Sequence, residues 1–253
     1  STYLNLPYTG VSSDNYNELS LGTDNKPYLL KQFQISGNTY TDILDDFVQL
    51  HSVSGAGAKT AFMEHTGGNV VSITNTVTNL INQVGVIICT YNGSGDNLWF
   101  MNRVAALGNG AIVITAGMRR PRDGVTANQS NLRAGLRIGT GDGTDGIFFK
   151  LNETTNSDKW QCITRASSVS TTTNTSVTTA KGAWVRLCIV INAAGTEANF
   201  YIDGTLVATH TTNLPATSLA LTGIMNVERV VVSSTLTWAI DCYRIKQTFT
   251  TPR

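Results

Sequence analysis

The amino-acid sequence predicts an all-β fold, an antiparallel β-sandwich, and three features of the chain predict it. Apolar residues alternate with other residues along Trp184–Ile191, so they share one face of a strand. Asp203 and Gly204 separate two further alternating segments, and an Asp-Gly pair in that place is a strong signal for a tight hairpin. From Leu98 onward, such segments recur at short intervals with Gly- and Asn-rich turns between them, which is typical of a sandwich or barrel.

The strands of this C-terminal part are predicted from the alternation of each segment. They are Leu98–Arg103, Ala111–Met118, Leu132–Ile138, Gly146–Leu151, Trp160–Arg165, Trp184–Ile191, Ala198–Ile202, Thr205–Thr209, Ser218–Leu221 and Thr237–Ile245. The Ser- and Thr-rich tract 167–179 is expected to form a long hairpin or an exposed sheet edge. An exposed edge invites pairing, so we expect a contact with another subunit there.

The N-terminal part, residues 1–50, is expected to be an irregular arm with strand fragments at Tyr28–Leu30 and Phe33–Ile35. Such an arm is either the first strand of the sandwich or an extension that clasps a neighbouring subunit. Apolar residues in Thr41–Leu50 recur close to helical spacing, so this segment is the one predicted helix.

Residues 51–253 are expected to form the sandwich itself. Two strands are predicted before Leu98, at Val70–Ile73 and Val84–Thr90. The second is nearly continuous in apolar residues, which favours an interior position in a sheet.

Several segments resemble the concanavalin A-like lectin/glucanase superfamily. They are a Trp that opens an apolar strand (Trp184), the hairpin Phe200–Gly204 with the following Leu214-Pro215, and Trp238–Ile245, which resembles that superfamily's closing strand. The resemblance extends over Leu98–Phe249 and implies a jelly-roll sandwich. Within the superfamily, the chain looks most like virion components of tailed bacteriophages, of head decoration or tail-fibre type.

Composition limits the partners. Charged residues make up 14% of the 253 residues and the formal net charge is +1, so the chain lacks the basic excess that nucleic-acid binding requires. No apolar run approaches the roughly 18 residues of a membrane span. The start of the chain, Ser1–Asn5, shows no secretory signal, which favours assembly in a host cytoplasm.

The cysteines are widely spread and include no Cys-x-x-Cys pair. They are Cys89, Cys162, Cys188 and Cys242. We expect buried, reduced thiols that act as small apolar side chains, with a disulfide as the alternative. The spacing does not favour a zinc site.

Catalysis is not expected. A retaining glycosidase needs two carboxyl groups about 5–5.5 Å apart, and the glucanases of the resembled superfamily carry a Glu-x-Asp-x-x-Glu strand. Here Asp45 and Asp46 are adjacent, which would turn them to opposite faces of a strand, and His65 and His210 are expected to be surface or satisfied core residues. The glutamates are isolated from one another: Glu18, Glu64, Glu153, Glu197 and Glu228. The sequence therefore nominates no catalytic and no cofactor-binding residue.

One loop suggests calcium. The segment Gly139–Gly146 holds Asp142 and Asp145 among glycines, and loop carboxylates with carbonyls can hold Ca²⁺. A plain Gly/Asp hairpin turn is the favoured interpretation, so no metal ligand is assigned. Stabilisation by Ca²⁺ that is lost in Asp142→Ala and Asp145→Ala would support a site.

Two other features bear on binding. The tryptophans are Trp99, Trp160, Trp184 and Trp238, and core burial is expected for them, with Trp160 as the exception and the candidate sugar platform. The basic cluster Met118–Asp123 is interpreted either as a solvated loop or as arginines that anchor an acidic patch of a partner protein.

These observations lead to one main expectation and two alternatives. The main one is a non-enzymatic structural protein of a virus particle, first a bacteriophage head decoration or cement protein and next a tail-fibre or other virion surface protein. Ser1, the residue left when an initiator Met is removed, favours a stand-alone accessory protein. Its expected partners are further copies of itself and a capsid protein. The alternatives are a carbohydrate-binding lectin-like module and a polysaccharide lyase or glycosidase.

Overall fold

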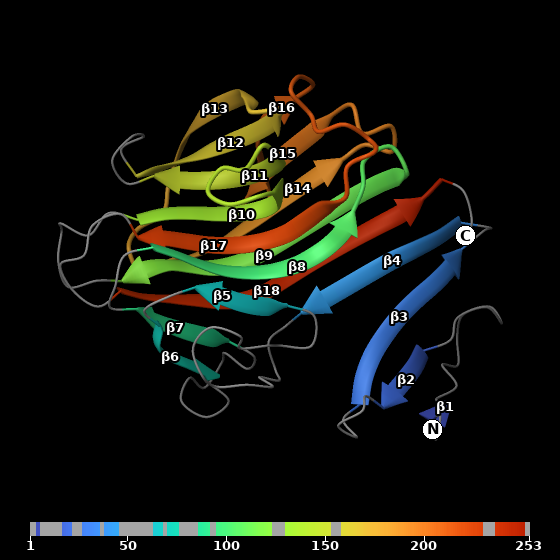
Figure 1. Cartoon of the computed structure of the whole chain (residues 1–253), viewed down its shortest axis with the longest axis horizontal. Coiled ribbons are helices and arrows are strands. Elements are labelled where there is room, and N and C mark those ends of the chain that lie inside the picture. Colours follow the sequence, from blue (N-terminus) through green and yellow to red (C-terminus); the bar gives the residue numbers. More distant parts are fainter. Residues whose placement is uncertain are drawn as a thin grey trace.

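The computed structural model consists of two antiparallel β-sheets packed face to face (Figure 1). It describes residues 4–5, 17–21, 27–35, 38–45, 63–67, 70–75, 86–91, 95–122, 130–152, 158–229 and 236–250. Within these ranges there is no helix, and so none long and apolar enough to cross a membrane. The predicted all-β sandwich is confirmed.

The larger sheet, sheet A, has eleven strands, in the order β1-β2-β3-β4-β18-β9-β14-β15-β16, with β7 beside β18 and β6 beside β7. Their bounds are Leu4–Asn5 (β1), Asn17–Leu21 (β2), Pro27–Ile35 (β3), Asn38–Asp45 (β4), Val70–Asn75 (β6), Ile87–Tyr91 (β7), Gly110–Arg122 (β9), Trp184–Ile191 (β14), Ala198–Ile202 (β15), Thr205–His210 (β16) and Leu236–Phe249 (β18). Because β7 lies between β6 and β18, its predicted interior position is confirmed.

The second sheet, sheet B, has seven strands in the order β13-β12-β11-β10-β17-β8-β5. Their bounds are Glu64–Gly67 (β5), Gly95–Ala105 (β8), Ser130–Ile138 (β10), Asp145–Asn152 (β11), Lys159–Ala166 (β12), Val169–Thr178 (β13) and Leu221–Arg229 (β17). The Thr-rich tract forms β13, which pairs only with β12, so the predicted exposed edge is confirmed.

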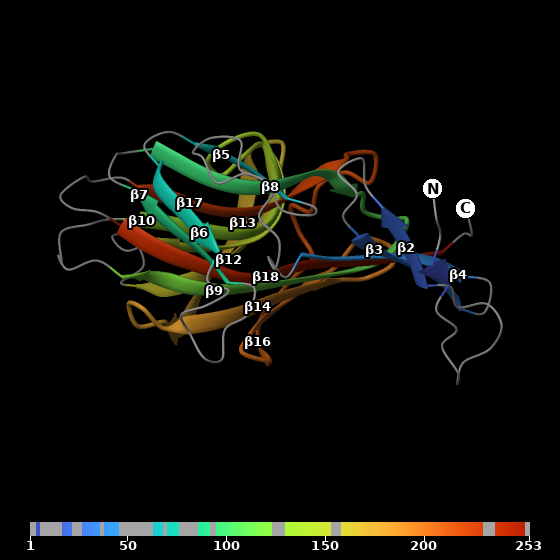
Figure 2. The same ribbon diagram turned by 90° about the horizontal axis from the view of Figure 1, so that it is seen from below.

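The predicted helix at 41–50 is wrong. Residues 41–45 belong to β4, which pairs with β3 on one side and with β18 on the other, and residues 46–50 lie outside the described ranges. Pairing on both sides provides hydrogen-bond partners for the backbone of β4. Such pairing outweighs the preference for a helix that a short helical spacing of apolar residues suggests. The two predicted N-terminal fragments are parts of the single strand β3. Figure 2 shows that β1–β4 continue sheet A past the region that sheet B covers.

The prediction of a strand at Ser218–Leu221 is also wrong, because the strand β17 begins at Leu221 and runs to Arg229. Gly223 breaks the apolar alternation that would have revealed it. That glycine lies against Tyr243 of sheet A: a Cβ at Gly223 would sit 2.8 Å from the Tyr243 hydroxyl oxygen. The close approach of the two sheets therefore requires glycine at this place.

The Asp203-Gly204 hairpin is confirmed. Both residues have positive φ, 49° and 83°, and Ile202 pairs with Thr205 across the turn. Positive φ at both central positions is what a tight two-residue hairpin needs, and it explains why this dipeptide marked the turn so clearly.

Buried side chains from both sheets meet between them. Phe149 of β11 contacts Trp160 of β12 and Phe200 of β15 edge to face, with ring centroids 6.2 and 5.2 Å apart. Tyr243 of β18 also crosses the layer, since its hydroxyl donates a hydrogen bond to the Gly135 carbonyl of β10 at 2.7 Å. The contact of Phe149 with Phe200 and the hydrogen bond from Tyr243 join the two sheets.

All four cysteines are free, as predicted, and burial raises the pKa of the Cys162 thiol to about 12. Cys89 and Cys162 are buried, but Cys188 and Cys242 are only half-buried. The prediction of burial is therefore wrong for those two, because they alternate with the core residues of β14 and β18.

Candidate functional site: the polar face of sheet B

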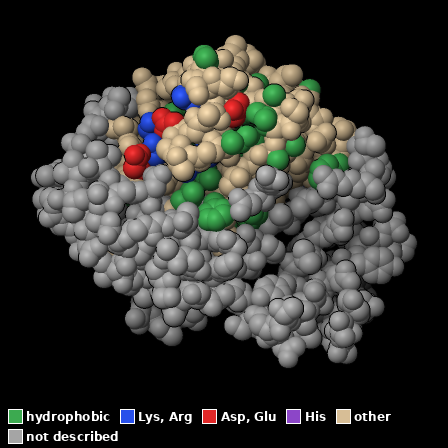
Figure 3. Space-filling view, viewed as in Figure 1, with side chains coloured by type: hydrophobic (Ala, Val, Ile, Leu, Met, Phe, Trp, Pro, Cys, Tyr) green, Lys and Arg blue, Asp and Glu red, His purple; other side chains and the backbone are tan. Residues whose placement is uncertain are grey.

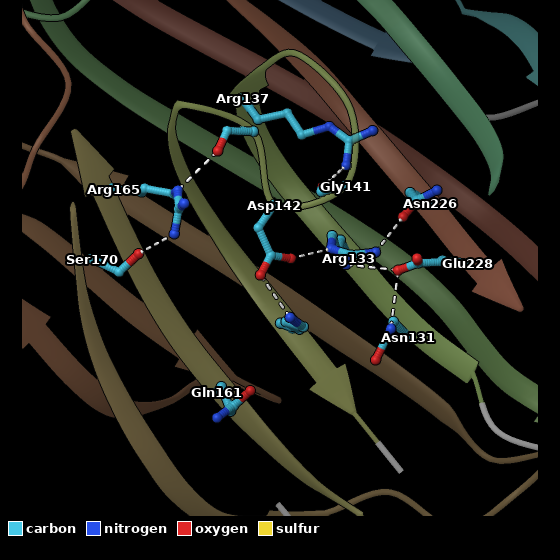
Figure 4. A network of polar contacts seen from close by, with 12 residues as sticks. Asn131, Arg133, Arg137, Gly141, Asp142, Gln161, Arg165, Ser170, Asn226 and Glu228 are labelled. Carbon is cyan, nitrogen blue, oxygen red and sulfur yellow. Dashed lines mark hydrogen bonds and ion pairs between the residues drawn. The ribbon is translucent and has the colours of Figure 1, made fainter. Parts of the chain in front are cut away.

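The face of sheet B that points away from sheet A is polar at its centre. Along β10, Leu132 and Leu136 belong to the core, so the alternate residues Arg133 and Arg137 lie on the outer face. The sheet register then places Lys150 of β11 and Asn226 of β17 on either side of Arg133. Figure 4 shows Arg133, Arg137 and Asn226 from close by.

Arg133 is the centre of the network. Its Nη1 donates to Asn226 Oδ1 at 3.0 Å, and its Nη2 contacts Glu228 Oε2 at 2.8 Å. The same Glu228 oxygen accepts a hydrogen bond from Asn131 Nδ2 at 3.0 Å. The Arg133 side chain is buried, and Glu228 keeps about a third of its side chain exposed. The network therefore joins a buried cation to a carboxylate that solvent reaches.

The loop between β10 and β11, residues 139–144, folds back onto this network. Asp142 accepts from Arg133 Nε through Oδ1 and from Lys150 Nζ through Oδ2, each at 2.7 Å. Two further arginines hold the loop backbone: Arg137 donates to the Gly141 carbonyl, and Arg165 of β12 donates to the Gly143 carbonyl at 2.8 Å (Figure 4). The loop is therefore clasped by cations from three adjacent strands.

Both carboxylates are held ionised. Burial raises the pKa of Asp142, but the hydrogen bonds and charges of Lys150 and Arg133 outweigh it, so the net pKa lies below the usual range. Glu228 behaves in the same way: burial raises its pKa, and Asn131, Arg133 and the charge of Lys150 bring it below normal. A carboxylate fixed in this way accepts hydrogen bonds and attracts cations but does not supply a proton at neutral pH.

The two aspartates of the loop that suggested calcium have different partners. Asp142 engages Arg133 and Lys150, whereas Asp145 Oδ1 accepts from the Ser167 backbone N–H at 3.0 Å. The part of the chain that the structure describes contains no group of three or more His, Cys, Asp or Glu side chains placed to hold a metal ion. The loop is the Gly/Asp turn that the sequence favoured, with Gly139, Gly141 and Gly143 at positive φ.

The assignment of Trp160 as a sugar platform is wrong. Trp160 is 0% exposed, and its Nε1 donates to Thr179 Oγ1 at 2.8 Å. Trp238 is buried as expected, whereas Trp184, at the start of β14, is half-buried with the Arg119 guanidinium 5.8 Å from its ring centre. The side chain of Trp99 lies outside the described set. The polar Asn-Ser-Asp-Lys segment before Trp160 suggested exposure, but Trp160 is the second residue of β12 and its side chain lies inside the sandwich.

In the basic cluster, the structure settles the role of Arg120. Residues 118–122 belong to strand β9, and Asp123 lies outside the described ranges. Arg120 is buried, and it donates to the Thr179 carbonyl at 2.5 Å and to Asp158 Oδ1 at 2.7 Å. Both earlier interpretations fail for Arg120, because its charge is satisfied within the fold.

His210 is confirmed as a satisfied core residue. Its two ring nitrogens lie 3.0 and 2.9 Å from the hydroxyls of Thr164 and Thr173, and burial lowers the pKa of the ring. Glu197 accepts from Asn199 Nδ2 in the β14–β15 turn, and Glu64 and His65 have side chains outside the described set. Sequence reasoning missed the contact of Glu228 with Asn131 and Arg133, because the strand that carries Glu228, β17, was missed.

Charged side chains also gather visibly on the surface of this face. In Figure 3, basic and acidic side chains of the described residues lie side by side in one part of the view. The polar network is thus the candidate site: hydrogen-bond donors and acceptors fixed in place on a rigid sheet, with its two carboxylates partly open to solvent.

Comparison with solved structures agrees with this architecture. The chain is similar to protein SO2946 of unknown function from Shewanella oneidensis MR-1, with 16% identity, a TM-score of 0.62 and coverage of 87% of this chain and 91% of that chain. It is similar to an endo-1,3-β-glucanase from Streptomyces sioyaensis (15% identity, TM-score 0.56, 87% and 99% covered) and to the carbohydrate recognition domain of Emp46p in its potassium-bound form (9% identity, TM-score 0.50, 72% and 87% covered).

These likenesses establish the fold, a concanavalin A-like jelly roll, and leave the chemistry to the site itself. No curated protein matches the sequence closely enough to count as a relative. The family model described as SO2946-like, C-terminal domain, matches residues 90–241, which is more than half of the chain and includes the strands of the polar network. The chain therefore belongs to the SO2946-like C-terminal domain family.

Proposed function

We propose that this chain is a non-enzymatic carbohydrate-binding protein, and that the sugar lies across the polar outer face of sheet B. The observation that carries the proposal is the fixed network around Arg133. It fixes the carboxylates of Asp142 and Glu228, each about a third exposed, at one surface, with the buried donors Asn131 and Arg133 behind them. Sugars are bound through such arrays, because each hydroxyl needs both a donor and an acceptor in a defined position.

The ionisation of the two carboxylates supports a binding role over hydrolysis. A glycosidase needs one carboxyl group that stays protonated near neutral pH in order to protonate the leaving oxygen. The pKa values of Asp142 and Glu228 are both lowered, so the two acids lack the opposed environments of an acid and a base pair. The glucanase and the carbohydrate recognition domain among similar structures lend the proposal a fold-level precedent only.

The test is a glycan array followed by calorimetry on the oligosaccharides that bind. We expect Asn131→Ala and Glu228→Gln to weaken binding about tenfold, the effect of one lost hydrogen bond to a charged group. Glu197→Gln is the matched control, because Glu197 lies in the β14–β15 turn of sheet A, and it should bind as the parent protein does. An array without any bound glycan, or release of new sugar ends from a bound one, would refute the proposal.

A structural role in a virus particle is the second candidate, and the free edge of sheet B favours it. Among the described strands, β13 pairs with β12 on one side and with none on the other, and Val169 at its start is 60% exposed. Sheet edges of this kind are commonly covered by another chain. Light scattering of the purified protein, alone and mixed with capsid shells, should then show a stable oligomer that adds to shells. A monomer that ignores shells would exclude the decoration role.

A further inference from the structure

The loop 139–144 sits on the polar face as a bound ligand would. Its Asp142 carboxylate has one oxygen on Arg133 Nε and the other on Lys150 Nζ, each at 2.7 Å. The two cations come from adjacent strands, β10 and β11, and the register places them directly opposite each other. A carboxylate held through both oxygens by two fixed cations is a strong and geometrically specific arrangement.

The two cations belong to the rigid sheet, whereas the carboxylate belongs to a glycine loop. Gly139, Gly141 and Gly143 have φ values of 87°, 59° and 69°, which favour glycine. A Cβ at Gly143 would lie 2.3 Å from the Ile138 carbonyl oxygen, so this residue must be glycine for the loop to fold back as it does. Asp142 also keeps about a third of its side chain exposed. The sheet thus supplies the two cations, and the loop supplies the carboxylate that lies between them.

Charge favours an acidic ligand at this place. In this network, Arg133 contacts the carboxylates of Asp142 and Glu228, and Lys150 contacts the carboxylate of Asp142. Arg137 and Arg165 hold the loop backbone through the carbonyls of Gly141 and Gly143. If Asp142 left, Arg133 would keep its contact with Glu228 and Lys150 would lose its contact with Asp142, so an incoming anion would restore the balance of charge.

We propose that Arg133 and Lys150 form a binding site for the carboxylate of an acidic sugar, and that Asp142 occupies this site until such a sugar displaces it. The inference rests on the proposed carbohydrate-binding function and names its ligand class, polysaccharides that contain uronic acids. Asp142 acts as an internal competitor: the fraction of protein with the loop displaced sets the observed affinity.

The experiment removes the negative charge of Asp142 and leaves Arg133 and Lys150 unchanged. Asp142→Asn retains the shape of the side chain and loses its charge. Calorimetry would measure the binding of oligouronates (glucuronate, galacturonate and mannuronate), of the matching neutral oligosaccharides, and of acetate. If about a tenth of the parent protein has the loop displaced, Asp142→Asn should bind oligouronates about tenfold more tightly. Lys150→Gln in the Asp142→Asn background should abolish that gain.

Two further variants keep the result interpretable. Asp158→Asn is the matched control, because Asp158 pairs with Arg120 away from this face, and its oligouronate affinity should equal that of the parent. Gly143→Ala displaces the loop without removing the Asp142 charge, so it should also tighten oligouronate binding if the loop is the competitor. It provides a second measurement if Asp142→Asn proves poorly folded.

The outcomes separate this inference from the proposed function. Tighter oligouronate and acetate binding in Asp142→Asn supports both. Tighter acetate binding without any sugar binding supports the carboxylate site and refutes the carbohydrate function. Binding of neutral sugars with no gain for oligouronates in Asp142→Asn and Gly143→Ala overturns the inference and leaves the carbohydrate function standing. No gain for any anion in either variant overturns the inference as well.

Discussion

Replacing Arg133 by Met should destabilise the protein by about 2–4 kcal/mol at neutral pH. The change removes a buried cation that contacts Asp142, Asn226 and Glu228, and breaking a buried ion pair on one side typically costs about 3–5 kcal/mol. The cost expected for Arg133→Met lies below that typical range because Asp142 and Glu228 are each about a third exposed, so water can partly solvate the two carboxylates. Urea unfolding followed by circular dichroism measures the difference.

The loss should depend on pH in a defined direction. Because the pKa values of Asp142 and Glu228 are lowered in the folded state, their stabilising effect is present above the ordinary carboxyl pKa of about 4. It disappears as the pH falls through the lowered folded values. The free-energy difference between Arg133→Met and the parent protein should therefore shrink in strong acid.

Arg186→Met provides the control for this prediction. Arg186 is exposed on β14 of sheet A, and surface substitutions of this kind usually change stability by no more than about 0.5 kcal/mol. If Arg133→Met were as stable as Arg186→Met at neutral pH, the network would contribute nothing net to folding. If the cost of Arg133→Met were the same at every pH, it would arise from lost packing and not from the two carboxylates.

The sequence predicts the fold well because a sandwich depends on local alternation and turn chemistry. The strand at Trp184–Ile191 and the Asp203-Gly204 hairpin are specified within a few residues, and the structure has both. Strand β4 could not be predicted in the same way, because its pairing with β3 and β18 brings together residues that are distant in sequence. Strand β17 was missed for a similar reason: Gly223 is required by Tyr243, a residue of another sheet.

The polar network was hidden from the sequence for a related reason. Glu228 is isolated along the chain, and only the register of β17 with β10 brings it to Arg133. Arg133 and Arg137 do carry a signal in the sequence, since each follows directly after a core leucine, Leu132 or Leu136, and so lies on the opposite face of the strand. Charges confined to one face of an otherwise apolar strand indicate a sheet face that is not part of the core.

The second large effect concerns the contact between the sheets, and Phe149→Ala should destabilise the protein by about 3–5 kcal/mol. Phe149 of sheet B is buried and lies edge to face against Trp160 in its own sheet and Phe200 in the other. Truncation removes the transfer free energy of the ring, leaves a cavity between two layers that are each held rigid by strand pairing, and loses both aromatic contacts. A protein of this size should lose roughly 2–4 °C in Tm for each kcal/mol.

Val169→Ala is the matched control for Phe149→Ala, because Val169 lies in sheet B but is 60% exposed at the free edge, and its truncation should change stability by less than about 0.5 kcal/mol. Thermal and urea unfolding of both variants would test the prediction. Equal stability of the two would mean that the sheets do not depend on this aromatic contact. A large loss in Phe149→Ala with unchanged ligand binding at low temperature would show instead that the inner face holds the sandwich together while the outer face, built on the same strands, carries recognition.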